Sequence, residues 1–274
     1  MNAIDLDAYV SRSAALDVSD LPWDDIPRFA IPDAALRTLR YMQDIESHTI
    51  VYLRELLSTR AIDDPAVATF LACWFYEETL HSRVLARFLE AAGDPVVARP
   101  RSAVSLAERA HAAAIGLVSK FWDDFVAVHM AWGASAELTT LAGYQRLAEL
   151  AGHPVLTELL ARIVRDETRH FAFYFKQAHQ RLQSPRIARI ARAIVERFWT
   201  PVGAGVQPAA ETLFVARYLF AGTDGALAAR KVDDTIRRLP GFTNIPLLER
   251  WLGRNTCDRR PPLVAATAEA LSTM

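Results

Sequence analysis

The chain has 274 residues, of which 51% are apolar and 23% charged, and its formal net charge is -1. This near-neutral balance argues against a surface that binds nucleic acid broadly. The two cysteines cannot form a disulfide framework, the acidic first 30 residues show no secretory signal, and no charge-free apolar run reaches about 18 residues. We therefore expect a cytoplasmic protein without a membrane span.

Apolar residues recur at spacings of three and four through most of the chain, which is the helical period, and strand signals are weak. We expect an all-α protein with an N-terminal extension over 1–32, a four-helix bundle over 33–183, C-terminal helices packed on the bundle over 184–260, and a tail over 261–274. The expected helices lie at about 33–60, 65–92, 103–151, 154–183, 185–199, 209–221, 224–238 and 245–253.

Turn signals separate the bundle helices. Asp64 suits the N-cap of the second helix and Pro65 its first position. Glycine and proline end the second helix at residues 93–95 and the third at residues 152–154. The third helical region contains Gly116 and Gly133, and we expect a bend near one of them.

Each of the four bundle helices carries a glutamate on its apolar stripe, and two of the helices add a histidine three residues later. Burying one unpartnered carboxylate costs several kcal/mol, so four at one level require cations. Residues at i and i+3 project from the same helix face and can bind neighbouring ions. The sequence therefore predicts a site for two metal ions, and its expected ligands are Glu46, Glu78, His81, Glu137, Glu167 and His170.

The hairpin turns give an independent check of this set. Residues equidistant from the turn of an antiparallel hairpin lie at the same level. Glu46 and Glu78 are centred on residue 62, inside the first turn, and Glu137 and Glu167 are centred on Gly152. The carboxylates of each hairpin are therefore expected to meet. Carboxylates with imidazoles and no thiolate favour iron, with manganese as the alternative.

The two motifs, Glu77-Glu78-Thr79-Leu80-His81 and Asp166-Glu167-Thr168-Arg169-His170, resemble those of the non-heme di-iron carboxylate proteins of the ferritin-like superfamily. The sequences of the two motifs are most similar to those of the soluble acyl-carrier-protein desaturases. The resemblance covers roughly residues 33–183. It implies a ferritin-like bundle in which Glu78 and Glu167 bridge two irons, with Glu46 and His81 completing one iron and Glu137 and His170 the other.

The resemblance also implies roles for three further residues. The acid before each bridging glutamate would hydrogen-bond a ligand histidine of the other motif, so Asp166 is assigned to His81 and Glu77 to His170. Thr140, one turn after Glu137, would relay oxygen or protons, although a core threonine bonded to its own helix backbone explains that position equally well.

Two features narrow the choice within the superfamily. The arylamine N-oxygenases add a histidine ligand at the position of Ile163, so that subgroup is disfavoured. Ribonucleotide reductase small subunits usually begin with an aspartate ligand and carry a radical tyrosine, whereas this chain has Glu46 at that place. We interpret the aromatic residues on the helix stripes, including Tyr144 and Tyr174, as core residues rather than redox residues.

The leading hypothesis is an oxidoreductase that uses dioxygen to desaturate or hydroxylate an acyl chain or a similar apolar substrate. Small residues near the ligands, Ala72, Gly133 and Ala136, are expected to line its channel. An external electron donor of the ferredoxin type and a homodimer are expected. A basic stripe around Arg186, Arg189 and Arg192 would suit an acidic carrier protein, although a solvated helix face explains it as well.

Three alternatives stay open at this point. The first is oxygenation of a small natural-product intermediate. The second is iron handling by a ferroxidase or storage protein, which the long C-terminal region disfavours. The third is a bundle that binds metal or ligand without turnover.

Overall fold

The structure is a computed structural model of the chain, and it describes residues 5–96, 124–204 and 207–256. Within these ranges the regular structure is helical, and the only β contact is an isolated bridge between Ala204 and Gln207. The all-α prediction is confirmed.

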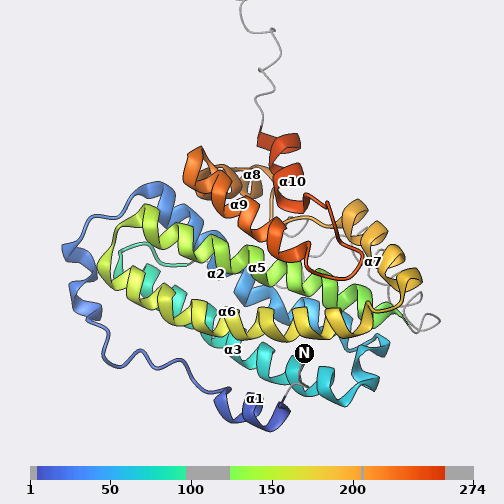
Figure 1. Cartoon of the computed structure of the whole chain (residues 1–274). Helices are drawn as coiled ribbons and strands as arrows, with labels where there is room; N and C mark the ends of the chain where they lie inside the picture. Colours follow the sequence, from blue (N-terminus) through green and yellow to red (C-terminus); the bar gives the residue numbers. More distant parts are fainter. Residues whose placement is uncertain (1–4, 97–123, 205–206, 257–274) are drawn as a thin grey trace, which may run out of the picture.

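Four long helices form the centre of the molecule, two antiparallel hairpins side by side (Figure 1). One hairpin pairs α2 with α3 and the other pairs α5 with α6, and α2 also contacts α5 while α3 contacts α6. The bounds are α2 Asp33–Leu56, α3 Pro65–Ala91, α5 Phe125–Ala151 and α6 Pro154–Arg181.

The turns that set the level of each hairpin are built as predicted. The Asp64 carboxylate accepts the backbone N–H groups of Ala66 at 2.9 Å and Val67 at 3.2 Å, and Pro65 opens α3. Gly152 ends α5 in the left-handed region, with φ at 59°. The His153 side chain then accepts the N–H of Leu156 and caps α6.

One prediction for the bundle helices was wrong, and a second is tested only in part. The first helix stops at Leu56 instead of near residue 60, because the Thr59 hydroxyl accepts the N–H of Ala61 and starts the separate 3-10 turn η2, Arg60–Asp63. α5 also runs unbroken through Gly133. A Cβ at Gly133 would lie 2.4 Å from the Tyr174 ring, so this glycine permits close packing of α5 on α6 rather than a bend. Gly116, the other position expected for a bend, and the first part of that predicted helix, 103–123, lie outside the described residues.

The N-terminal extension contains two helical segments that the sequence patterns did not indicate, α1 (Leu6–Arg12) and η1 (Trp23–Arg28). α1 lies against α3. Its Tyr9 is buried, with ring centroids 5.6 Å from Phe70 and 5.9 Å from Phe173.

The C-terminal third forms shorter helices close to the predicted ranges, and α7, α8 and α9 all contact α5. The predicted tail, 261–274, lies outside the described residues. None of the described helices combines the length and apolar character that a membrane span requires. The bounds are α7 Pro185–Phe198, α8 Ala209–Phe220, α9 Gly222–Ile236 and α10 Leu247–Thr256.

Candidate metal centre

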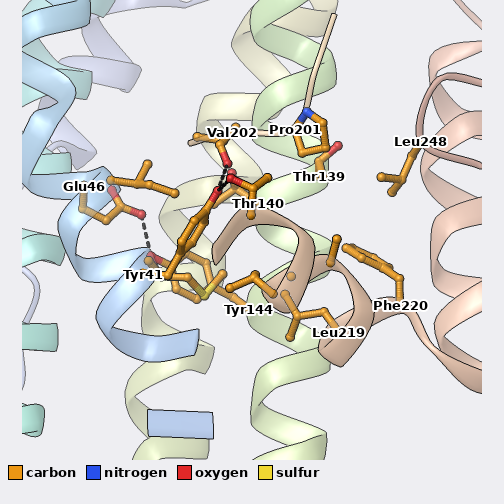
Figure 2. Close-up of a pocket in the computed structure, with 16 residues that line it drawn as sticks. Tyr41, Glu46, Thr139, Thr140, Tyr144, Pro201, Val202, Leu219, Phe220 and Leu248 are labelled. Carbon is orange, nitrogen blue, oxygen red and sulfur yellow. Dashed lines mark hydrogen bonds between the residues drawn. The ribbon is translucent and has the colours of Figure 1, made fainter. Parts of the chain in front are cut away.

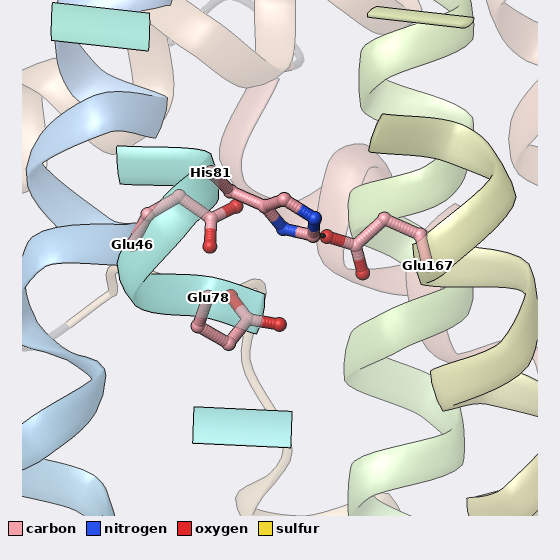
Figure 3. A group of neighbouring side chains, drawn as sticks. All are labelled: Glu46, Glu78, His81 and Glu167. Carbon is pink, nitrogen blue, oxygen red and sulfur yellow. Dashed lines mark ion pairs between the residues drawn. The ribbon is translucent and has the colours of Figure 1, made fainter. Parts of the chain in front are cut away.

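The six predicted ligand residues come together inside the bundle, and each is at most 8% exposed. The two Glu-x-x-His helices, α3 and α6, each supply a carboxylate and an imidazole, while α2 and α5 supply one carboxylate each. Figure 3 shows four of these side chains pointing toward one another from their helices. Each hairpin turn sets its own two glutamates at one level, and the contacts of α2 with α5 and of α3 with α6 bring the two pairs together.

The ligand atoms divide into two overlapping groups, and within each group they lie within 4.8 Å of one another. The first group is Glu46, Glu78, His81 and Glu167, and the second is Glu78, Glu137, Glu167 and His170. Both groups contain Glu78 and Glu167, one from each Glu-x-x-His motif. Two adjacent four-ligand clusters that share two carboxylates can hold a pair of metal ions.

Several inward-facing ligand atoms have no hydrogen-bond partner within the described ranges: Glu46 Oε2, both carboxylate oxygens of Glu167, and Nδ1 of His81 and of His170. The carboxylate oxygens nearest these nitrogens are 3.4 Å from His81 Nδ1 and 3.1 Å from His170 Nδ1, without hydrogen-bond geometry. Buried polar atoms are normally satisfied, so this concentration of unsatisfied donor atoms needs an explanation. Bound metal ions provide one, and the residues present fit two.

The outer nitrogens of both histidines contact the carboxylates that the sequence assigned to them. His81 Nε2 lies 3.2 Å from Asp166 Oδ2, and His170 Nε2 lies 2.7 Å from Glu77 Oε2. These contacts favour the proton on Nε2 and leave the Nδ1 lone pair free for a metal ion.

Arg169 joins the two outer carboxylates, a contact that the sequence did not indicate. Its guanidinium donates to Glu77 Oε1 at 2.8 Å and to Asp166 Oδ1 at 2.6 Å. Burial by itself raises the pKa of both acids, but the hydrogen bonds from histidine and Arg169 outweigh it and hold each pKa below its usual value. Both acids therefore remain ionised at neutral pH.

The inner ligands show that the cluster requires positive charge. Burial, reinforced by neighbouring carboxylates, raises the pKa of Glu46 and of Glu137 well above the usual value, and raises that of Glu78 to about 7. Burial lowers the pKa of His81, but the hydrogen bond to Asp166 and the charges of the nearby Glu167 and Glu46 carboxylates more than compensate and raise it to about 9. Burial by itself raises the pKa of Glu167, but His170 and His81 outweigh it and hold that pKa below its usual value. In the absence of metal, protons on Glu46, Glu137 and the two histidines therefore offset the charge of the cluster, and metal ions would replace them.

Two contacts to the centre come from residues that the sequence analysis did not assign to it. The Tyr144 hydroxyl donates to Glu46 Oε1 at 2.5 Å, deep in the bundle. Ser13, in the N-terminal extension, donates to Glu77 Oε1 at 2.8 Å. The apolar stripe indicated that Tyr144 is buried, but nothing in the sequence indicated the partner of either hydroxyl.

A cavity of about 260 Å³ adjoins the ligand cluster and reaches Glu46, Glu78, Glu137 and Glu167. Predicted channel residues Gly133 and Ala136 line it, and so does Thr140, whereas Ala72 is exposed on the outer side of α3 and does not. Aromatic side chains form much of the remaining wall: Tyr52, Trp74, Trp132 and Tyr174.

Behind the aromatic wall lies His129, a buried histidine that the sequence analysis did not single out. Its Nδ1 is 3.2 Å from the Tyr52 hydroxyl, and its ring packs against Tyr174 at 5.8 Å between centroids. Burial lowers its pKa to about 4, so His129 is neutral at physiological pH.

Comparison of the sequence with protein-family models and with curated proteins finds no match. A function for this chain must therefore be argued from the site itself.

Proposed function

We propose that this chain is a dioxygen-activating di-iron oxidoreductase that desaturates or hydroxylates an apolar substrate such as an acyl chain. The observation that carries the proposal is the pair of buried four-ligand groups that share Glu78 and Glu167 and adjoin a cavity. Structural sites are usually closed on all sides, whereas a catalytic centre keeps space for its substrates.

The ligand set suits iron, with manganese possible at one or both positions, because it consists of carboxylates and imidazoles and neither group contains a cysteine. Two bound iron ions would supply the capacity to reduce dioxygen, the co-substrate, and to oxidise a C–H bond. The resemblance of the two motifs to the acyl-carrier-protein desaturases supports the same reaction class.

The protein's own residues prepare this centre. Glu77 and Asp166 orient the two imidazoles, and Tyr144 holds Glu46 through its short hydrogen bond. Because the ligands are buried, bulk water screens their charges only weakly, and the electrostatic interactions among the ligands are stronger than they would be at the surface. Thr140 lines the cavity together with Glu46, and this position supports the role assigned to it, relay of a proton between a bound substrate and the ligand carboxylates.

A second candidate substrate class, a small natural-product intermediate, is favoured by the cavity itself. Its volume of about 260 Å³ is below the roughly 300 Å³ at which cavities for drug-sized ligands begin. The buried indole N–H of Trp74, a residue of the wall, has no hydrogen-bond partner among the described residues. A compact substrate with a hydrogen-bond acceptor would satisfy it.

Partners remain part of the proposal. An external electron donor of the ferredoxin type and a homodimer are expected from the resemblance. Arg186 and Arg189 are exposed on α7, as docking of an acidic acyl carrier requires, while Arg192 is 3.5 Å from Glu196 and is partly neutralised.

Oxygen consumption by the ferrous-loaded protein tests the proposal. The protein would be supplied with an electron donor in two parallel series of assays. One series would contain acyl-carrier thioesters, and the other would contain compact aromatic compounds that carry a hydrogen-bond acceptor. Oxygen consumption that requires one of the two substrate classes would support the oxidoreductase, and it would show which of the two classes the protein oxidises. Stoichiometric oxidation of the metal without product from any substrate would contradict the proposal and favour iron handling.

A further inference from the structure

The hydroxyl groups that contact the metal centre come from two different parts of the chain. The Tyr144 hydroxyl, which donates to Glu46, belongs to α5 of the bundle itself (Figure 2). The Ser13 hydroxyl, which donates to Glu77, belongs to the N-terminal segment, defined here as residues 5–13, which contains α1. A part of the chain outside the bundle therefore contacts the carboxylate that orients a ligand histidine.

The N-terminal segment has few contacts to hold it on the bundle. α1 is seven residues long, and Tyr9 is its buried residue, packed against Phe70 and Phe173. In Figure 1, α1 lies beside α3 at the edge of the bundle, and an extended link joins it to the rest of the chain. A helix of this length is not stable by itself. The segment can therefore detach by local opening while the bundle stays folded.

The docked segment contacts both members of the ion pair behind His170. Ser13 Oγ lies 2.8 Å from Glu77 Oε1, the same oxygen that accepts from Arg169, while Glu77 Oε2 accepts from His170. The Arg169 guanidinium lies 5.6 Å from the centre of the Tyr9 ring. Buried charge-assisted hydrogen bonds are stronger than solvated ones. Undocking would remove one donor from Glu77 and admit water to this network, so it would hold the His170 imidazole less firmly.

Docking therefore acts first on the ligand group that contains His170, because Glu77 contacts that histidine. We propose that the N-terminal segment is a strap that positions Glu77, and through it His170, so that docking of the strap and metal binding stabilise each other. Thermodynamic linkage then makes two factors equal: the gain in metal affinity on docking, and the gain in docking on metal binding. The inference requires that the centre binds metal, and it does not depend on the proposed reaction.

Trypsin measures docking without relying on activity. Arg12 is exposed in the last turn of α1, and cleavage after it releases residues 1–12, which mass spectrometry detects. Cleavage follows the population of the opened segment when opening and closing are fast. Anaerobic loading with ferrous iron should slow release of this fragment several-fold in the wild type. Equal rates of release with and without iron would overturn the inference.

Anaerobic competition for ferrous iron measures the other side of the linkage. Ser13→Ala removes the donor and Tyr9→Ala removes the docked ring, and both should lose metal affinity several-fold while circular dichroism shows a folded bundle. Tyr9→Phe should keep wild-type affinity, because the buried Tyr9 hydroxyl has no hydrogen-bond partner among the described residues. Ser11→Ala is the matched control, since the exposed Ser11 hydroxyl donates to the Ala8 carbonyl oxygen of the same helix.

A double-mutant cycle separates positioning of Glu77 from a general effect on stability. Glu77→Gln removes the charged acceptor of the Ser13 hydroxyl. Ser13→Ala should therefore cost clearly less metal affinity in the Glu77→Gln background than in the wild type, because residues that share one network are not additive. Equal losses in the two backgrounds, or wild-type affinity in folded Ser13→Ala and Tyr9→Ala, would contradict the proposal.

Discussion

Glu77 makes the shorter of the two contacts between an outer carboxylate and a ligand histidine, and we therefore choose Glu77→Gln as the perturbation. The carboxylate is 1% exposed and accepts hydrogen bonds from Ser13, Arg169 and His170. Glutamine has nearly the same shape and can still accept from His170 through its oxygen, but it removes the negative charge and turns its amide nitrogen, a donor, toward the Arg169 guanidinium. The variant therefore removes the charge of Glu77 together with the hydrogen bond from Arg169, while it keeps the one from His170.

The expected magnitude follows from the His170 contact. At 2.7 Å it lies at the short end of charge-assisted N–H···O distances, and such bonds are about twice as strong as neutral ones. A hydrogen bond to a charged group contributes about 1.5–3 kcal/mol, so removing the charge should cost about 1 kcal/mol or somewhat more. That cost corresponds to roughly a tenfold loss of metal affinity, at the lower end of the 10- to 100-fold range for supporting residues.

The assay is anaerobic competition for ferrous iron between the protein and a chromophoric chelator, after circular dichroism has shown that the variant is folded. Asp166→Asn should lose less affinity, because its contact with His81 is longer, at 3.2 Å. Glu90→Gln, an exposed change on the same helix, is the matched control and should behave like the wild type. Wild-type affinity in folded Glu77→Gln, or equal losses in Glu77→Gln and Glu90→Gln, would refute this reasoning.

Three further predictions concern single contacts. Tyr144→Phe removes the donor to Glu46 and should weaken metal binding about tenfold in the same competition; unchanged affinity would show that the bond does not orient the ligand. His129 has a folded pKa of about 4, below its usual 6.5, so the unfolded state binds the proton first and stability falls as the pH drops from 6.5 toward 4. Between pH 7.5 and pH 5, the free energy of unfolding measured in urea should therefore fall by roughly 2 kcal/mol less in His129→Gln than in the wild type. An equal pH dependence in the two proteins would contradict the low pKa of His129. Gly133→Ala places a methyl 2.4 Å from the Tyr174 ring and should destabilise the fold by about 1–3 kcal/mol, whereas Gly253→Ala should not; equal stabilities would contradict this packing.

The sequence was most informative where local geometry determines the outcome. The i, i+3 spacing places Glu78 with His81, and Glu167 with His170, on one helix face whatever the rest of the chain does. The turns at Asp64 and Gly152 then fix the level at which each hairpin's carboxylates meet, and the structure brings all six predicted ligands together. The contacts of Glu77 and Asp166 with the histidines also agree with the assignment made from the motif resemblance.

The remaining features depend on contacts between distant parts of the chain, which spacing does not determine. Tyr144 and Glu46 are 98 residues apart, and Ser13 and Glu77 are 64 apart. The contact between the Tyr41 and Thr212 hydroxyls requires α8 to pack beside α2, and no periodic pattern specifies that arrangement. Ala72 was misplaced for a related reason, because a small residue near a ligand in sequence can lie on the opposite side of its helix.

The central claim is that one chain binds two metal ions through these six residues. The most direct test is anaerobic titration with ferrous iron, with bound metal quantified by elemental analysis after gel filtration. We predict two iron ions per chain for the wild type, and a clear loss in Glu46→Ala and in His170→Ala, each of which removes a ligand from one of the two groups. Full metal occupancy in both variants, or no stoichiometric binding by the wild type, would contradict the account.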